Sequence, residues 1–189
     1  MRHQRRVLFL AALPLLLAGC GYNSIQRFDE QTAQAKQQIA VQLQRRADLI
    51  PNLVKTVEGF AQQEREVLIG VTQARAGLTS AVQSGDLSQM AVANDQLTGA
   101  LGRLLVTVEA YPQLKSDQTF IRLMDELAGT ENRVAVARTD YNTTVERYNS
   151  YIRQFPQVMT AKVTGAKPRE YFQLQSAGAD TAPKVDFGK

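Results

Sequence analysis

Residues 42–61, QLQRRADLIPNLVKTVEGFA, decide the fold class of this chain. Their apolar residues recur at alternating steps of three and four, the spacing of a helix that packs along one seam. The seam continues on both sides, through Ile39, Leu43, Arg46, Ile50, Leu53, Val57, Phe60, Glu64, Val67 and Val71. Only two of these positions are charged, so the segment predicts an amphipathic helix with two polar interruptions.

Pro51 leaves the length of this first helix open. Either the helix continues with a kink and loses the hydrogen bond to Ala47, at a cost of about 3 kcal/mol, or Asp48 caps a new helix. The unbroken seam favours the kink. Length favours a division, because a continuous helix over 22–82 would outrun its partners by about 30 Å. The sequence thus predicts four main helices, or three if helix 1 is continuous through Pro51.

Two later segments carry the same seam spacing. The segment 87–111 follows Asp86, a good N-cap residue. The segment 120–155 follows Ser116, a second candidate cap, and stops at Pro156. At about 1.5 Å per residue this last helix is close to 60 Å long. We therefore expect an all-α fold, an elongated antiparallel up-and-down helical bundle over residues 20–156.

Charged residues interrupt the apolar seams at four places. Arg46 and Glu64 lie on the first seam, and Glu131 and Arg138 lie on the third. An unpaired charge on a buried seam costs several kcal/mol, so we expect pairing, with Glu131 and Arg138 as partners two turns apart. We interpret the four residues as fixing the register of the helices. A role in binding a partner or conducting ions is the alternative.

A Tyr-Asn pair occurs twice in the third segment, at a spacing of seven residues. This spacing stacks both pairs on one helix face. Tyr141 and Tyr148 should therefore lie in the core with polar tips, and Asn142 and Asn149 should form hydrogen bonds between helices. A ligand-binding role for these asparagines is the alternative.

The N-terminal segment is typical of a targeting signal, because Arg2, Arg5 and Arg6 precede an apolar run over 7–18. At about 1.5 Å per residue the run spans about 18 Å, less than the roughly 30 Å of a bilayer's hydrocarbon core. A transmembrane anchor is therefore the less favoured interpretation.

The sequence Leu17-Ala18-Gly19-Cys20 resembles a bacterial lipobox. We expect residues 1–19 to be removed as a lipoprotein signal peptide and Cys20, the only cysteine, to be the lipid attachment site. Palmitate-like acyl chains add about 0.8 kcal/mol per buried methylene, so several chains attach the protein permanently. An ordinary signal peptide with a chance cysteine is the alternative.

These features place the protein in the cell envelope. In a Gram-negative cell, Gly21 after the cysteine leaves the periplasmic face of the outer membrane as the expected site. The formal net charge is +4, and removal of the three leader arginines reduces it to +1. No concentrated basic face remains, so nucleic acid is not an expected partner.

Catalytic residue types are scarce. The only histidine, His3, lies in the leader, so the mature chain cannot build the usual Ser-His, Cys-His or zinc sites. Neither an Asp-rich calcium loop nor a glycine-rich phosphate loop is present. We therefore expect no enzyme activity, no catalytic residues, no cofactor and no metal site.

Residues 157–189 form a C-terminal extension in which the helical pattern fades. We expect it to be partly disordered or docked. The aromatic residues of KPREYF, at 167–172, are suited to docking on the bundle, and a solvated tail is the alternative.

Several stretches together resemble the LemA family of bacterial envelope proteins. They are YNSIQRFDE at 22–30, QLQRRADLIPNLVKTVEGFA at 42–61, VTQARA at 71–76, ENRVAVAR at 131–138, YNTTVERYNSYIRQFP at 141–156, KPREYF at 167–172 and APKVDF at 182–187. The resemblance implies a four-helical bundle on a membrane, which favours division at Pro51, and a role for the tail. The chain departs from the family at 163–166, where relatives are more aromatic, so apolar docking is not expected there.

The resemblance supplies no catalytic residues. It implies envelope partner proteins, including membrane proteins with TPM domains, and an N-terminal membrane segment that acyl chains on Cys20 replace here. We therefore expect a lipid-anchored scaffold or adaptor, compatible with a homo-oligomer. The alternative is a self-assembling membrane-active protein that remodels or stabilises the bilayer, and an enzyme of unrecognised type is the third hypothesis.

Overall fold

The computed structural model describes the backbone of residues 2–172 and the side chains of residues 21–172. Within this range the chain forms six helices and no strand, which confirms the all-α class. The helices are α1 (Arg2–Glu58), α2 (Arg65–Ser84), α3 (Leu87–Val108), α4 (Pro112–Lys115), α5 (Gln118–Tyr151) and α6 (Gln157–Thr164).

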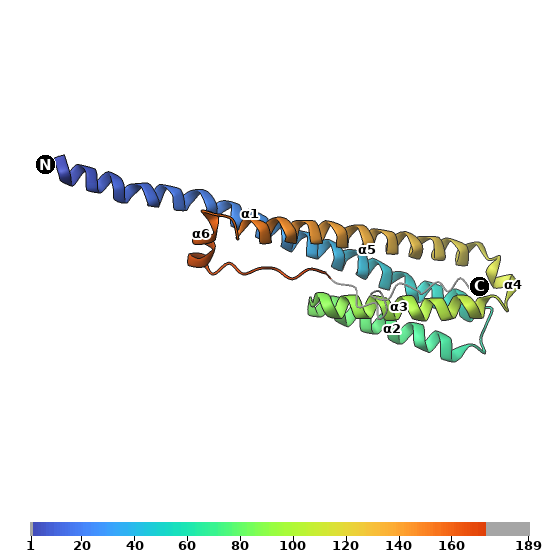
Figure 1. Cartoon of the computed structure of the whole chain (residues 1–189). Coiled ribbons are helices and arrows are strands. Elements are labelled where there is room, and N and C mark those ends of the chain that lie inside the picture. The colour runs from blue at the N-terminus through green and yellow to red at the C-terminus, as the bar shows by residue number, and fades with distance from the viewer. Residues whose placement is uncertain (1, 173–189) are drawn as a thin grey trace, which may run out of the picture.

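The helices form an elongated rod (Figure 1). Helix α5 lies along α1, with the end of α5 against the start of the bundled part of α1. Helices α2 and α3 form a hairpin against the later part of α1, and α4 makes the turn into α5. Helix α6 packs on α1 at the opposite end, where α1 leaves the rod. None of the helices described is long and apolar enough to cross a bilayer.

Helix α1 continues through Pro51, so a division at that residue is wrong. Pro51 is exposed between the buried Ile50 and Leu53, and the seam therefore keeps its register across it. Asp48 caps no helix, because it lies inside α1, where its carboxylate accepts a hydrogen bond of 2.7 Å from Gln44 Nε2. The break that we predicted from helix length occurs later, between Glu58 and Arg65. The long helices are therefore α1, α2, α3 and α5.

Other helix boundaries also differ from the sequence prediction. Asp86 caps α3 as predicted, accepting from Gln89 N at 3.0 Å. Helix α5 is capped by Asp117 instead of Ser116, because the Asp117 carboxylate accepts from the backbone N–H groups of Thr119 and Phe120. It ends at Tyr151, so its 34 residues span about 51 Å instead of 60 Å. Helix α6 is a further element, beyond the predicted end of the bundle.

Helix lengths divide the rod into two halves. Residues 21–58 of α1 span about 57 Å, whereas the 20 residues of α2 and the 22 of α3 span only about 30 Å. The hairpin stops where Val82 of α2 lies beside Ala40 and Val41 of α1. We call the part that contains α2 and α3 the four-helix half. Residues 21–36 of α1 and 139–151 of α5 form the two-helix half.

Two buried clusters run along the rod. The larger one lines the four-helix half, with fully buried residues such as Leu43, Ile50, Leu78 and Leu104, and it continues into the two-helix half through Tyr141, Val145 and Phe172. The smaller one holds Ile25, Tyr148, Ile152 and Ala161 and joins α1, α5 and α6. In the same half the rings of Phe28 and Tyr151 meet edge to face, with centroids 5.0 Å apart.

Candidate functional site

A buried arginine ties three helices together in the four-helix half. Arg46 of α1 is 3% exposed. Its Nη1 donates to Asn94 Oδ1 and forms an ion pair with Glu131 of α5, and its Nη2 donates to Thr98 Oγ1 at 3.1 Å. Burial lowers the pKa of Arg46, and the Glu131 carboxylate opposes this shift. The guanidinium remains charged, because arginine does not lose its proton in proteins.

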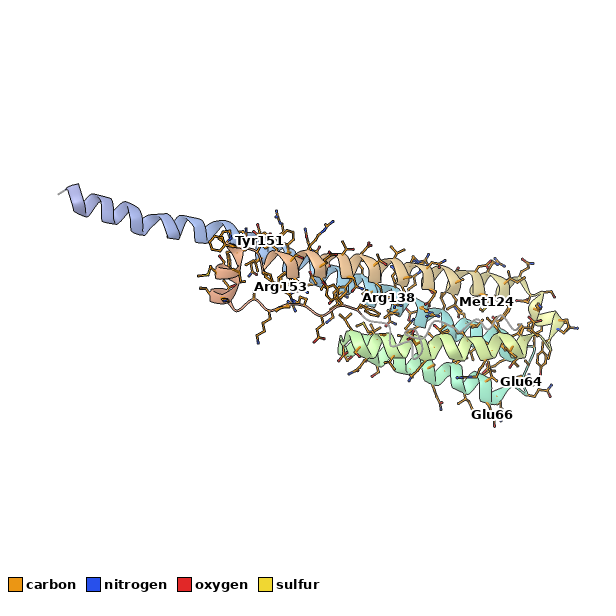
Figure 2. All side chains as sticks on the ribbon, in the orientation of Figure 1. Glu64, Glu66, Met124, Arg138, Tyr151 and Arg153 are labelled. Atoms are coloured by element: carbon orange, nitrogen blue, oxygen red, sulfur yellow. The ribbon has the colours of Figure 1, made fainter. Side chains whose placement is uncertain are left out.

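The predicted ion pair between Glu131 and Arg138 is wrong. Seven residues of helix separate their Cα atoms by about 10.5 Å along the axis, whereas Arg46 reaches Glu131 directly from α1. The Arg138 guanidinium instead lies over the ring of Phe172, 4.6 Å from its centroid. Figure 2 places Arg138 midway along α5.

Glu64 lies outside the packed seam. It occupies the loop before α2, at the far end of the rod (Figure 2). Its Oε1 accepts a hydrogen bond of 2.8 Å from the hydroxyl of Tyr111, which precedes α4. Glu64 therefore joins two loops, and the predicted seam residues Arg46, Glu131 and Glu64 do not form one site.

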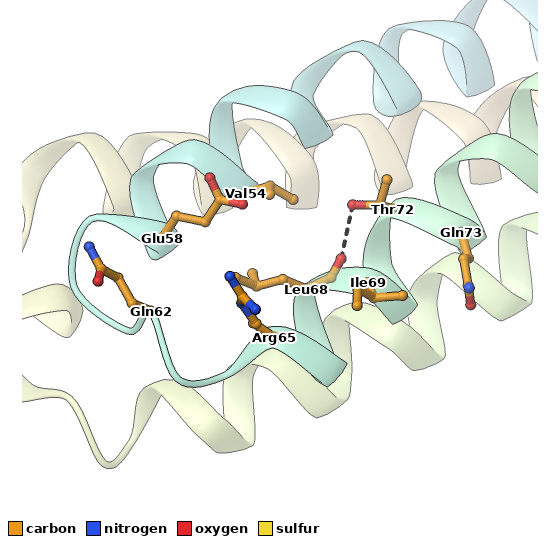
Figure 3. Close-up of a pocket in the computed structure, with 8 residues that line it drawn as sticks. All are labelled: Val54, Glu58, Gln62, Arg65, Leu68, Ile69, Thr72 and Gln73. Carbon is orange, nitrogen blue, oxygen red and sulfur yellow. Dashed lines mark hydrogen bonds between the residues drawn. The ribbon is translucent and has the colours of Figure 1, made fainter.

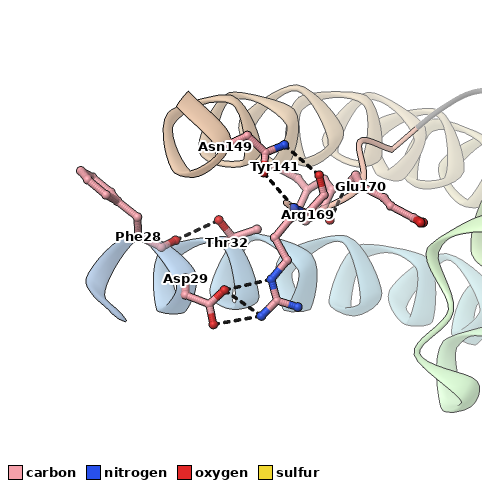
Figure 4. Close-up of polar contacts among 7 residues, drawn as sticks. All are labelled: Phe28, Asp29, Thr32, Tyr141, Asn149, Arg169 and Glu170. Carbon is pink, nitrogen blue, oxygen red and sulfur yellow. Dashed lines mark hydrogen bonds and ion pairs between the residues drawn. The ribbon is translucent and has the colours of Figure 1, made fainter. Parts of the chain in front are cut away.

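Two asparagines of α5 hold an extended segment of the chain. Asn149 Oδ1 accepts from Arg169 N, and Asn149 Nδ2 donates to Arg169 O, both at 2.8 Å. Asn142 pairs in the same way with Phe172, at 2.8 and 3.2 Å. We call residues 166–172 the clasped segment (Figure 4). The prediction that Asn142 and Asn149 bond between helices is wrong, because their partner is extended backbone.

The spacing of the asparagines matches the spacing of the backbone that they hold. Asn142 and Asn149 are seven residues apart, or about 10.5 Å along the helix axis. Arg169 and Phe172 are three residues apart, or about 10 Å in extended chain. Because the two rises agree, both amides can pair at once. This match gives the recurring Tyr-Asn pair a structural role.

Side chains complete the clasp. Arg169 forms two 2.9 Å hydrogen bonds with the carboxylate of Asp29 on α1, and this contact raises the pKa of Arg169 (Figure 4). Phe172 is buried beneath Arg138, and Tyr141 donates from its hydroxyl to Glu170 O at 2.9 Å.

The docking prediction for 167–172 is confirmed in part. Hydrogen bonds hold the backbone of Arg169 and Phe172, and Phe172 is buried, whereas Tyr171 is exposed. The rest of the tail, with APKVDF at 182–187, lies outside the described residues. Apolar docking is weak at 163–166, as expected, because Val163 is 88% exposed and only Ala166 packs on the core.

The predicted core tyrosines are confirmed. Tyr141 and Tyr148 are each 3% exposed, and burial raises the pKa of both hydroxyls. The Tyr141 hydroxyl reaches the clasped segment through its hydrogen bond to Glu170 O, so core and clasp meet at this residue.

Two surface grooves are open to solvent. The first, of about 700 Å³, lies between the end of α1 and the start of α2 (Figure 3). It is lined by Val54, Glu58, Gln62, Arg65, Leu68, Ile69, Thr72 and Gln73. The second, of about 750 Å³, runs between α1 and α5. Its lining is rich in amides, with Gln31, Gln34, Gln38 and Gln42 on α1 facing Asn132 and Val136 on α5.

Sequence reasoning missed several of these residues. Asn94 interrupts the apolar seam of α3, and that interruption is the signal that could have identified it as a partner of Arg46. Asp29 and Arg169 are 140 positions apart and carry no local signal. The residues described contain no group of three or more His, Cys, Asp or Glu side chains arranged to hold a metal ion. The side chain of Cys20 lies outside the described ones.

The sequence of this chain is similar to those of several known bacterial proteins. The sequence model of the LemA family matches residues 35–187. Magnetosome protein MamQ 2 of Paramagnetospirillum magneticum is 31% identical over 183 residues, which cover 83% of this chain and 66% of that protein. MamQ of Magnetospirillum gryphiswaldense is 27% identical, and the match again covers 83% of this chain and 66% of that protein. Protein LemA of Metamycoplasma hominis is 23% identical, and the match covers 70% of this chain and 60% of that protein. The match thus spans just under two thirds of the length of the MamQ relatives.

Proposed function

The chain belongs to the LemA family, and on that premise we propose that it is a non-enzymatic, lipid-anchored scaffold or adaptor of the bacterial cell envelope. Residues 1–19 act as the signal peptide and Cys20 carries the acyl chains. The partners are envelope proteins, which by family resemblance include proteins with TPM domains.

The groove between α1 and α5 is the observation that carries this proposal. Its glutamines, at positions 31, 34, 38 and 42, follow helical spacing along one face of α1. Val136 offers an apolar contact on the other wall and is 60% exposed. Gln42 Oε1 is buried, and no described group donates a hydrogen bond to it.

A helix of a partner protein fits this groove best. Two neighbouring helices leave a groove parallel to their axes, and a third helix buries its apolar stripe there. The glutamine amides provide donors and acceptors for polar residues at the edges of that stripe. The lining contains no nucleophile paired with a base, so the groove is suited to recognition.

Site-specific crosslinking from intact membranes tests the adaptor function. A photoreactive residue at Val136 should give a stoichiometric adduct with one envelope protein. The matched control is Ala135, the exposed neighbour that does not line the groove, and it should give none. A monomer that crosslinks to nothing from Val136 would contradict the proposal.

Self-assembly on the membrane is the second candidate. It is favoured by Val106 of α3, which is 76% exposed and gives the rod a second apolar contact besides Val136. It predicts that the Val136 probe captures another copy of the chain. Liposomes should also be remodelled by the lipidated protein and unaffected by the Cys20→Ser variant.

A further inference from the structure

The end of the rod beside Cys20 has a distinct surface. Helix α6 packs directly on the first described side chains of α1. A Cβ atom on the buried Gly21 would lie 3.4 Å from Thr160 Oγ1 and 3.5 Å from Gln157 Cγ. Ala161 anchors α6 in the smaller core. The position next to Gly21 is Cys20, so α6 is adjacent to the proposed lipid attachment site.

The outer side of this end is apolar. Phe155 is 83% exposed, Met159 59% and Val163 88%. Met159 and Val163 are four residues apart in α6 and therefore share one face. Single exposed apolar side chains are common on the surface of ordinary proteins. A group of large ones this exposed indicates an interaction surface. We call residues 152–168 the foot.

The foot is also basic. It contains Arg153, Lys162 and Lys167, all exposed, and no acidic residue. Figure 2 shows Arg153 at this end of the rod, beside Tyr151. The nearest acid of α1 that contacts the C-terminal chain, Asp29, is already paired with Arg169. The three positive charges are therefore not neutralised by an ion pair among the described residues.

We propose that the foot binds the surface of the membrane, with its three apolar side chains among the lipid headgroups and its three cations against anionic phosphates. Exposed apolar residues flanked by lysine and arginine are typical of interfacial membrane binding. Lysine and arginine side chains near an anionic lipid surface are attracted to its phosphates. The charge favours a lipid surface over an apolar patch on a second copy, which would bring like charges together.

This inference rests on the proposed lipid anchor for its geometry. Acyl chains at Cys20 would hold the foot at the bilayer, so the weak interfacial contact becomes intramolecular and its effective concentration is high. Two attachment points then restrict the tilt of the rod, whereas acyl chains alone leave it free to swing. The groove between α1 and α5 would be presented in a fixed direction.

Tryptophan fluorescence can test the foot directly, because the chain contains no tryptophan. Phe155→Trp places one reporter in the foot, and Val106→Trp places the matched reporter on the exposed surface of α3. The full chain is purified from membranes and reconstituted in phosphatidylcholine vesicles with and without phosphatidylglycerol, some with brominated acyl chains. Intact mass measures acylation, and flotation measures membrane attachment.

The Phe155→Trp emission should shift to the blue and be quenched several-fold more by brominated lipid than the Val106→Trp emission. Replacing Lys162 with Glu should reduce that quenching in anionic vesicles. If the protein floats but both reporters remain equally unquenched, the foot proposal is overturned and the anchor stands. A blue shift that depends on protein concentration without vesicles would also overturn it, because a second copy would then cover the foot.

A chain that lacks acylation would instead contradict the proposed function. The foot is then tested by adding the same vesicles to that unacylated chain. Quenching of Phe155→Trp by anionic brominated vesicles supports lipid binding, and its absence overturns it.

Discussion

The two halves of the rod cover the apolar faces of α1 and α5 with different elements. In the four-helix half, α2 and α3 cover the apolar faces of α1 and α5, and one buried arginine ties the helices. In the two-helix half those helices are missing, and α6 with the clasped segment takes their place. The clasped segment has the right length to replace them. Its seven extended residues span about 23 Å, close to the length of α1 that α2 and α3 leave uncovered.

The two-helix half shows how an extended segment can replace a helix. A helix satisfies its own backbone hydrogen bonds, so side chains in the four-helix half need only pack and set register. An extended segment exposes its N–H and C=O groups, and these need partners where they are buried. Asn142 and Asn149 supply those partners because each amide holds one acceptor and two donors.

The largest loss of stability is expected for Glu131→Leu, in the four-helix half. The variant leaves Arg46 buried without its carboxylate, and we expect a loss of about 2–3 kcal/mol in the free energy of unfolding. The loss stays below that of a fully buried pair because Glu131 is 39% exposed. Urea unfolding measures it, with Glu126→Leu at an exposed site of the same helix as the control.

The double variant Arg46→Met, Glu131→Leu sharpens this test. Apolar replacement of both partners removes the uncompensated charge, so stability should recover in large part. If Glu131→Leu keeps full stability and loses only the crosslinked partner, Glu131 belongs to a binding surface and not to the fold.

In the other half, Asn149→Ala should open the clasp without unfolding the rod. The loss of both hydrogen bonds to Arg169 costs about 1–3 kcal/mol locally. Amide exchange at Arg169 and Phe172 should accelerate roughly tenfold to a hundredfold. The urea midpoint should change little. Asn132→Ala, an exposed asparagine of the same helix, is the control, and equal exchange in both variants would contradict the clasp.

Alkaline pH should also weaken the two-helix half first. Burial raises the pKa of Tyr141 and Tyr148 above the ordinary value of 10.0, so their stabilising contribution is complete below pH 10.0 and declines as pH rises beyond it. Ionised Tyr141 can no longer donate to Glu170 O. Absorbance at the phenolate band and the melting temperature, both followed against pH, measure the effect.

Tyr141→Phe should flatten part of that alkaline decline. Tyr171→Phe, at a site 46% exposed, should leave the decline unchanged. A decline that is the same in both variants would assign the pH response to other groups.

The smallest effect is expected for Asp29→Asn. The pair with Arg169 is exposed at the surface, so its loss should cost about 0.2–1 kcal/mol and should shrink as salt rises. Urea unfolding at low and high salt measures it, with Glu30→Gln as the control on α1. A loss as large as that of Asn149→Ala would mean that the ion pair, and not the asparagines, holds the segment.

Seam spacing predicted the helical class and the place of the long helices, because burial of one face imposes its period on the sequence. It also favoured a helix that continues through Pro51, as α1 does. Helix length and the family resemblance misplaced the first division at Pro51, because the position of the break depends on how far the partner helices extend. The Glu131 pairing failed for a related reason: spacing within one helix does not reveal a closer partner on another. The clasp was predictable only in part, since the Tyr-Asn repeat marks one side of it and an irregular segment forms the other.

Asn142 and Asn149 form hydrogen bonds with main-chain atoms, and nearly every residue type carries these atoms. Within 169–172, Arg169 and Phe172 add recognition through their own side chains, whereas Tyr171 faces solvent. The positions between the two anchors therefore tolerate exchange of one amino acid for another. A foreign dipeptide at 170–171 would therefore be displayed on the rod in a fixed place beside α5.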